Sequence, residues 1–412
     1  MNNRISIGII FSLFFVSASA TVFAQTDLKF DFSSGQPESG WTQVTGTNFY
    51  SDDAGFGFEP GANVAAGKTA TSSTSAFYFS VKLPEGNYKV TATLGGDADS
   101  TTTVKAELRR LMVEKDHTAA GAQDTRTFIV NIRTPVISTG GQVHLKPRES
   151  TTEMWAWDDK MTLEFNGSNP TLSKLEIEKA DVPTLFILGD STICDQPTEP
   201  WNSWGQMLPR FLKPEIAVAN NAESGESLAS SLGAKRFDKV FSEMKPGDYL
   251  FMQFGHNDQK SKDPNALSIY VANLSSVVDR TRAAGGTPVL VTSMERKAGV
   301  TQDTLAGYPD AVRAVAEWKN CALIDLNAMS RVFYRALGPD IGKAFQDGTH
   351  HNNYGSYELA KCIVDGIKKD KLPIAKYISD DFTDFDPAHP DSVNDFQMPA
   401  SPRMSIVKPL GS

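Results

Sequence analysis

Residues 184–192 read Thr-Leu-Phe-Ile-Leu-Gly-Asp-Ser-Thr, and this stretch decides the fold. An unbroken apolar run that ends in a glycine is typical of a strand buried on both faces of a parallel sheet. Comparable runs recur at 216–219, 249–254, 288–292 and 322–326. Amphipathic segments alternate with these runs, so the pattern predicts a parallel sheet covered by helices on both faces.

Ligands of open parallel sheets bind beyond the carboxyl ends of the strands, so the residues after each run are candidates for chemistry. Ser191 follows the first run, on a strand-to-helix turn whose backbone N–H groups suit an oxyanion. Asn257 follows a later run, and its side-chain amide can donate to a developing negative oxygen. Each residue also has an ordinary interpretation, Ser191 as a helix N-cap and Asn257 as part of a turn with Asp258.

Two further segments hold candidates. Gly225 lies in the loop 220–227, where a glycine lets its backbone N–H approach a ligand closely, although this segment taken alone is better explained as a flexible loop. Asp347 and His350 lie three residues apart on a tight turn before the last predicted helix. The carboxylate can accept from one ring nitrogen while the other nitrogen faces a nucleophile.

In this order, the segments 189–191, 225, 255–258 and 347–350 resemble the four sequence blocks of the SGNH (GDSL-type) hydrolase superfamily. Together with Trp-Gly-Gln at 204–206, they look like the rhamnogalacturonan acetylesterase branch, carbohydrate esterase family 12. The resemblance covers about residues 183–372. It implies a flavodoxin-like, three-layer α/β hydrolase domain that needs no metal and no organic cofactor.

The resemblance also implies roles for individual residues. Ser191 is the nucleophile, His350 the general base, and Asp347 the residue that orients His350. The oxyanion hole consists of the backbone N–H groups of Ser191 and Gly225 and the side-chain amide of Asn257. Glu226 departs from the branch, in which a basic residue more often follows the glycine.

The remaining motifs narrow the chemistry. A G-x-S-x-G elbow is absent, since 225–229 fails at its last position, which argues against an α/β-hydrolase lipase. The six histidines include one adjacent pair, His350-His351, and have no metal-ligand spacing. Cys194 is either a thiol with a pKa lowered by a helix N-terminus or, more commonly, a buried structural cysteine. Trp201 and Trp204 either form a sugar-stacking wall or pack in the core.

Upstream of this region, short alternating runs separated by Gly, Ser, Asn and Pro predict an antiparallel, jelly-roll-like β-sandwich over 25–180. We interpret 104–113 as one strand with a bulge at Arg109-Arg110. The aromatic residues of this domain either bind carbohydrate or form its core and a docking face, and the second interpretation is favoured because aromatics in small sandwiches are usually buried. They are Trp41, Phe49, Tyr50, Phe56, Phe58, Trp155 and Trp157.

Residues 1–24 have the layout of a cleaved signal peptide, with a basic start at Arg4, an apolar run over 5–16 and small residues at the cleavage region. The run is too short for the ~20 residues of a spanning helix, and no later stretch is apolar enough to span a membrane. We therefore expect a secreted or periplasmic protein. The full layout is a signal peptide (1–24), a β-sandwich that is a candidate for carbohydrate binding (25–180), a catalytic domain (181–375) and an extended C-terminal tail (376–412).

Composition excludes several classes of protein. With 412 residues, 40% hydrophobic and 22% charged, the chain is neither disordered nor a coiled coil. Lys and Arg number 40 against 49 Asp and Glu, and the net charge of −9 gives no general attraction to nucleic acid. The three cysteines are too few for a disulfide framework.

The sequence thus predicts a secreted serine esterase that removes O-acetyl groups from a plant cell-wall polysaccharide or its oligosaccharides, with rhamnogalacturonan of pectin as the first choice. One alternative is an esterase of the same superfamily that acts on acetylated xylan, a host glycan or a short acyl ester. Another is a non-catalytic glycan-binding protein. The intact set of Ser191, Asn257, Asp347 and His350 argues against this last alternative.

Overall fold

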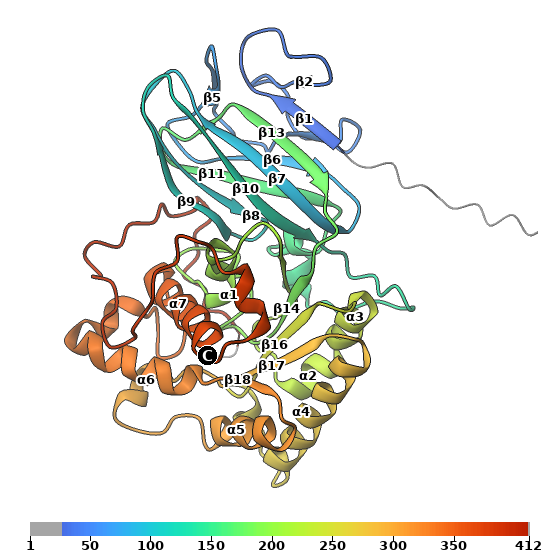
Figure 1. The fold of residues 1–412 in the computed structure, drawn as a ribbon, viewed down its shortest axis with the longest axis vertical. Helices are drawn as coiled ribbons and strands as arrows, with labels where there is room; N and C mark the ends of the chain where they lie inside the picture. The colour runs from blue at the N-terminus through green and yellow to red at the C-terminus, as the bar shows by residue number, and fades with distance from the viewer. Residues whose placement is uncertain (1–26, 411–412) are drawn as a thin grey trace, which may run out of the picture.

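The structure is a computed structural model that describes residues 27–410. The predicted signal peptide lies outside these residues. An all-β domain comes first in the chain and an α/β domain follows, and the β domain lies above the α/β domain in Figure 1. Both predicted fold classes are confirmed. Between residues 27 and 410, no helix is long and apolar enough to cross a membrane.

The β domain contains two five-stranded sheets and one small sheet, with antiparallel pairing except between β1 and β2. The first sheet has the order β10 (Gln123–Ile132), β7 (Gly86–Gly95), β13 (Lys174–Lys179), β1 (Asp27–Asp31), β2 (Thr42–Gln43). The second has the order β3 (Phe56–Phe58), β6 (Phe77–Lys82), β11 (Lys160–Ser168), β8 (Ser100–Ala106), β9 (Arg110–Thr118). The small sheet has the order β12 (Thr171–Leu172), β5 (Thr71–Ser72), β4 (Ala65–Ala66).

Alternation along the strands builds the core between the large sheets. Along β7, Tyr88, Val90, Ala92 and Leu94 are buried while the residues between them are partly exposed. Phenylalanines supply much of the remaining core, and each contributes about 1.5–3 kcal/mol by burial. Those that are fully buried are Phe32, Phe58, Phe77, Phe79 and Phe165.

The prediction of one bulged strand over 104–113 is wrong. The chain turns back at residues 107–109, and β8 and β9 form a hairpin around this turn. Glu107 and Arg109 both have positive φ, 56° and 65°, which reverses the chain where a bulge would have let it continue. The turn is polar because it docks on the other domain, where Arg109 donates to the carbonyl oxygens of Gln196 and Trp201.

The α/β domain is built on a parallel sheet of order β15-β14-β16-β17-β18. This is the flavodoxin-like order, in which the chain changes direction between the first and third strands. The strands are β14 (Thr184–Gly189), β15 (Ala217–Asn220), β16 (Tyr249–Gln253), β17 (Thr287–Val291) and β18 (Ala322–Ile324).

Helices cover both faces of this sheet, which is why its strands are apolar throughout. In β14, Leu185 and Ile187 face one core, and Phe186 and Leu188 face the other. The α-helices are α1 (Trp204–Met207), α2 (Leu228–Gly233), α3 (Arg236–Glu243), α4 (Ala266–Ala283), α5 (Tyr308–Trp318), α6 (Leu326–Leu337) and α7 (Asn353–Lys369). The 3-10 helices are η1 (Pro147–Ser150), η2 (Met154–Ala156), η3 (Leu208–Phe211), η4 (Asp258–Lys260), η5 (Lys297–Val300), η6 (Gly338–Ala344) and η7 (Pro373–Tyr377).

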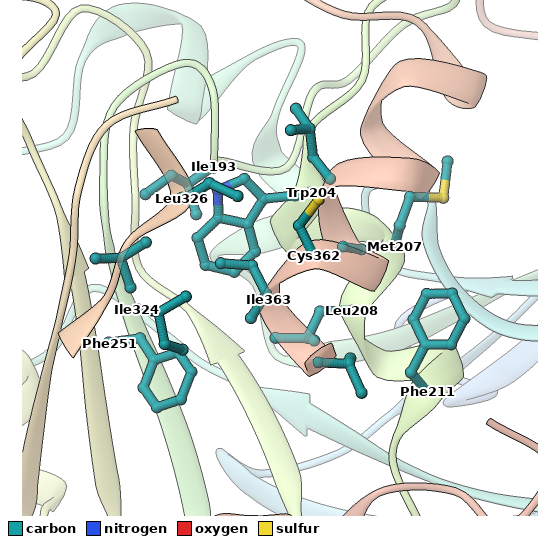
Figure 2. Close-up of a cluster of buried hydrophobic side chains, with 14 of the residues drawn as sticks. Ile193, Trp204, Met207, Leu208, Phe211, Phe251, Ile324, Leu326, Cys362 and Ile363 are labelled. Carbon is teal, nitrogen blue, oxygen red and sulfur yellow. The ribbon is translucent and has the colours of Figure 1, made fainter. Parts of the chain in front are cut away.

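The larger core lies between the sheet and the helices α1, α6 and α7. Figure 2 shows the indole of Trp204 among Ile193, Leu326, Cys362 and Ile363. Trp204 is 1% exposed, and its Nε1 donates to Gln253 Oε1 at 3.0 Å. It is therefore a core residue that also fixes the end of β16.

Buried arginines join the two domains. Arg110, at the start of β9, donates to the Val218 carbonyl oxygen at 2.9 Å. Arg236, in α3, donates to both carboxylate oxygens of Glu149 in η1, at 3.0 and 2.6 Å, and both side chains are almost fully buried. The described chain beyond Tyr377 has no regular strand or helix, and it returns to the β domain, where Lys105 Nζ donates to the Pro399 carbonyl oxygen.

We expect Arg236→Leu to lower the free energy of unfolding by about 3–5 kcal/mol, because it leaves the Glu149 carboxylate buried without its partner. Arg280→Leu is the matched control, since Arg280 pairs with Asp238 at the surface and its loss costs about 1 kcal/mol or less. Urea unfolding of the two variants measures the difference. Equal, small shifts in both variants would contradict a central role for the buried pair.

Candidate active site

Ser191 lies on the turn that follows β14, at the carboxyl edge of the sheet. The side chain of Asp190 shapes this turn by accepting hydrogen bonds from the Thr192 backbone N–H at 2.9 Å and from its hydroxyl at 2.7 Å. Gly189 is required before the turn, because a Cβ there would lie 2.5 Å from the carbonyl oxygen of Gln253. The hydroxyl of Ser191 is thereby held in place at the point where strands β14 and β16 diverge.

His350 and Asp347 come to this serine from the loop before α7. His350 Nε2 lies 2.8 Å from Ser191 Oγ, and His350 Nδ1 lies 2.9 Å from Asp347 Oδ2. The other carboxylate oxygen of Asp347 accepts from the backbone N–H groups of Thr349 and His350, at 2.6 and 2.7 Å. The structure thus joins three predicted site residues that span 159 positions of sequence in one hydrogen-bonded chain.

The electrostatics of this chain favour an ionised aspartate. Burial opposes the charge on Asp347, but hydrogen bonds from the His350 ring and backbone outweigh it and hold the pKa of this carboxyl well below its ordinary value. A carboxylate fixed on one ring nitrogen sets the tautomer of His350, so that the other nitrogen can accept a proton from the serine. Chemically, the arrangement can activate the Ser191 oxygen as a nucleophile.

The loop with Gly225 lies against the Ser191 turn. The backbone N–H of Glu223 donates to the Gly189 carbonyl oxygen at 3.1 Å, and Ser224 Oγ lies 3.2 Å from Cys194 Sγ. Gly225 has φ of +77°, a conformation that favours glycine. Its Cα faces the C-terminal tail, because a Cβ at this position would lie 3.0 Å from that of Leu410.

Asn257 is tied to the same loop. Its Nδ2 donates to the carbonyl oxygen of Glu226 at 2.9 Å, which leaves a second N–H on that amide. The structure therefore brings Asn257 beside the Gly225 loop and the Gly225 loop beside Ser191. Roles for the three predicted oxyanion donors remain a prediction.

The sequence motifs did not assign a role to several residues that lie near Ser191. His256 Nδ1 lies 3.2 Å from Asp190 Oδ2, so this buried histidine contacts the side chain that shapes the serine turn. Arg296 donates to the hydroxyl of Thr349 and to the His256 carbonyl oxygen, which links the loop before α7 to the end of β16. The sequence feature that could have pointed to this support is His256 itself, which lies inside the segment 255–258.

For Cys194 and for the two tryptophans near the serine, the structure favours a role in packing. Cys194 is buried, and burial raises the pKa of its thiol well above the ordinary value. Trp201 is 5% exposed, with its ring edge-on to His350 at 5.9 Å, and its Nε1 donates to the Ser405 carbonyl oxygen. Trp204 lies in the core, so neither tryptophan presents an open face for a sugar.

The aromatic residues of the β domain have mixed environments. Phe58 lies in the sandwich core, Trp157 is buried at the domain interface, and Phe49 is half exposed. Carbohydrate binding by this domain stays a prediction. In the described part of the chain, no group of three or more His, Cys, Asp or Glu side chains is arranged to hold a metal ion.

Two pockets open next to residues of the predicted site segments, 255–258 and 347–350. A pocket of about 480 Å³ opens beside Asn257 and is bordered by Lys260 and Tyr270. A second pocket, of about 700 Å³, opens beside Thr349 and is bordered by Arg296. Each pocket is large enough for a sugar-sized group, and neither is lined by Ser191 or His350, which are 1% and 2% exposed.

Two family models match the chain. The GDSL-like Lipase/Acylhydrolase family matches residues 187–356. The Beta-agarase/YXIM esterase-like, galactose-binding domain-like family matches residues 28–145. The first match contains the serine turn, the Gly225 loop and the Asp347–His350 turn, and the second lies within the β domain.

Similar proteins come from Bacillus subtilis (strain 168). The rhamnogalacturonan acetylesterase RhgT is 33% identical over 216 aligned residues, covering 47% of this chain and 93% of that protein. The uncharacterized esterase YxiM is 29% identical over 374 residues, covering 83% of this chain and 90% of that protein. A crystal structure of the YxiM protein is 26% identical, covers 84% of this chain and 99% of that chain, and has a TM-score of 0.46.

We expect the stability of the protein to fall in acid through His351, the neighbour of the proposed base. His351 is buried with its Nε2 2.9 Å from the Tyr334 hydroxyl, and burial lowers its pKa to about 3. A histidine in the unfolded chain has a pKa of about 6.5. Between these values the unfolded chain binds a proton that the folded chain does not, so the free energy of unfolding decreases as pH falls, by up to about 1.4 kcal/mol per pH unit.

His351→Gln should flatten this acid slope, measured as urea-unfolding free energies between pH 7 and pH 4. His389→Gln, a change at a largely exposed histidine, serves as the control and should leave the slope as it is in the wild type. An acid slope that is unchanged in the His351 variant would show that other groups cause the loss.

Proposed function

Because this chain belongs to the GDSL-like lipase/acylhydrolase (SGNH hydrolase) family of ester hydrolases, we propose that it is a serine esterase that removes O-acetyl groups from a polysaccharide. The observation that carries the proposal is the contact of His350 Nε2 with Ser191 Oγ at 2.8 Å, with Asp347 on the other ring nitrogen. A serine hydroxyl so placed is a nucleophile whose proton already has an acceptor.

The reaction follows from this geometry. Ser191 Oγ attacks the ester carbonyl carbon while His350 Nε2 takes its proton, and a tetrahedral intermediate forms. His350 then gives that proton to the leaving sugar oxygen, so the sugar hydroxyl departs and an acetyl-enzyme remains. Water attacks the acetyl group with His350 again as base, and acetate leaves. Asp347 keeps the imidazole in the productive tautomer and stabilises its charged form.

The negative oxygen of the intermediate needs donors that are in place beforehand. The backbone N–H groups of Ser191 and Gly225 and the second N–H of the Asn257 amide are the groups we assign to it. Each such donor lowers the barrier by up to about 3–4 kcal/mol in other oxyanion holes. The hydrogen bond from Asn257 to the Glu226 carbonyl oxygen supports the assignment, because it orients the amide beside the loop that holds Gly225.

Rhamnogalacturonan of pectin is the polysaccharide that we propose. The similarity to the rhamnogalacturonan acetylesterase RhgT supports it, because that similarity extends over 93% of RhgT. The pockets beside Asn257 and Thr349 also support a polymer, since each offers space to a sugar next to a predicted site segment. We further propose that the protein is secreted or periplasmic, where such a polymer is accessible, on the basis of the signal-like segment 1–24.

The purified protein should release acetate from acetylated rhamnogalacturonan faster than from acetylated xylan or small acetyl esters. Ser191→Ala should abolish this release while the fold persists, since the nucleophilic oxygen is gone. EDTA should leave the rate unchanged, because a side-chain oxygen and not a metal-bound water attacks the ester. Near wild-type turnover by the alanine variant, or EDTA inactivation reversed by a divalent ion, would overturn the serine mechanism. A preference for xylan would overturn only the choice of substrate.

Replacement of the orienting carboxylate tests the chain of hydrogen bonds. Asp347→Asn should lower kcat on p-nitrophenyl acetate by about 10²–10⁴-fold, because the amide no longer stabilises the charged imidazole or its tautomer. The KM should change little, since Asp347 does not contact the ester. As a control, Asp303→Asn alters an exposed carboxylate that accepts from the Leu305 backbone N–H, and it should leave kcat unchanged. A kcat within twofold of the wild type in Asp347→Asn would contradict the role.

A further inference from the structure

The loop that carries Gly225 is held by a side chain from outside the catalytic domain. Lys146 lies between β10 and β11, at the N-cap of η1, where the β domain extends toward the serine turn. Its Nζ donates to the carbonyl oxygen of Ser224 at 2.6 Å and lies 2.8 Å from Glu226 Oε1. The ammonium group therefore contacts the residues immediately before and after Gly225.

The first contact acts on the peptide that would donate to the oxyanion. The carbonyl of Ser224 and the N–H of Gly225 belong to one planar trans peptide, so fixing the direction of the C=O fixes the N–H on the opposite side. A glycine at positive φ has access to several backbone conformations, and the hydrogen bond from Lys146 selects one of them. The positive charge also polarises this peptide and makes its N–H a stronger donor.

The second contact balances a charge. The Glu226 side chain is only 2% exposed, and its own carbonyl oxygen accepts the hydrogen bond from Asn257. A buried carboxylate beside an oxyanion would repel it unless a cation lies nearby. Lys146 is the closer cation, and Arg236 Nε lies 3.9 Å from the same carboxylate oxygen. Ser230 Oγ donates to the other oxygen of Glu226.

Lys146 is itself firmly placed. Its backbone N–H donates to Glu149 Oε2 at 2.8 Å, and Glu149 also accepts from Arg236 and from Trp157 Nε1. Next to it, Arg148 pairs with Glu223, the residue at the start of the Gly225 loop. The segment from Lys146 to Trp157 thus forms a clasp on the loop, and it lies between the two regions matched by family models, 28–145 and 187–356.

We infer that Lys146 is a positioning residue of the oxyanion hole, supplied by the β domain, which orients the Ser224–Gly225 peptide and neutralises Glu226. This inference rests on the proposed serine-esterase function. The catalytic domain is then incomplete without this segment.

The test uses the full chain and kinetics on p-nitrophenyl acetate. Lys146→Met should lower kcat by about 10–100-fold with KM within about twofold, because the donors act on the intermediate and not on the bound ester. Lys146→Arg keeps the charge and a donor, so it should retain kcat within about fivefold of the wild type. Adding Glu226→Gln to Lys146→Met should recover at least about fivefold in kcat, because it removes the uncompensated carboxylate.

Lys245→Met is the matched control, since Lys245 pairs with Asp181 at the surface of the catalytic domain and should leave kcat unchanged. Circular dichroism and urea unfolding report whether each variant is folded. If the methionine variant does not fold, Lys146→Ala takes its place, because it also removes both the donor to the Ser224 carbonyl and the charge. In a folded variant, kcat within twofold of the wild type overturns the inference, and so does the absence of any recovery in the double variant.

The outcomes separate this inference from the function on which it rests. If the wild type and Ser191→Ala hydrolyse the ester equally slowly, the proposed esterase function fails. If the wild type is active, Ser191→Ala is inactive and Lys146→Met matches the wild type, the function stands and the role of Lys146 is wrong. If Lys146→Met lowers kcat and Lys146→Arg retains it, the results support both the esterase function and the role of Lys146.

Discussion

Three buried guanidinium groups reach acceptors across the boundary between the two domains, and these contacts set how the domains meet. Arg109 and Arg110 extend from the β8–β9 hairpin, where Arg109 lies 2.6 Å from Glu199 and Arg110 donates to a β15 carbonyl oxygen. Arg236 extends the opposite way, from α3 to Glu149. If one domain slid against the other, several buried charges would lose their partners at once. The two domains therefore dock in one arrangement, and that arrangement carries the η1 segment onto the loop beside the serine.

The local sequence was sufficient to predict the part of the site that depends on the parallel sheet. The apolar run before Ser191 has buried neighbours on both faces, so its composition reports its position in the sheet directly. Ser191 and Asn257 follow adjacent strands, and His350 precedes the last helix, so the topology alone predicts that they share one edge. The structure places Ser191 and His350 in hydrogen-bond contact, while their catalytic roles stay a prediction.

Features that depend on contacts between the domains were not predictable in this way. The alternation of Val104, Ala106 and Leu108 fits a bulged strand, and only docking partners in the other domain explain a turn with positive φ at Glu107 and Arg109. Lys146 is likewise an ordinary lysine before Pro147, and nothing nearby in sequence points to Ser224, 78 positions away. Such residues acquire their function from long-range partners, and one sequence contains no periodicity that reports those partners.

An acidic protein that stabilises an anionic intermediate must also control its own carboxylates near that intermediate. This chain carries a net charge of −9, yet the acids around the Gly225 loop contribute little free negative charge. Glu226 is paired with Lys146. Glu223 is held against the Arg148 guanidinium, so a cation of the η1 segment balances its charge as well. Burial raises the pKa of Asp258, beside Asn257, to about 7. The donors of the proposed oxyanion hole therefore act in a field that these neighbours oppose little. Lys146 and Arg148, which pair with Glu226 and Glu223, both come from the segment between β10 and β11, and this makes the β domain part of the electrostatic environment of the site.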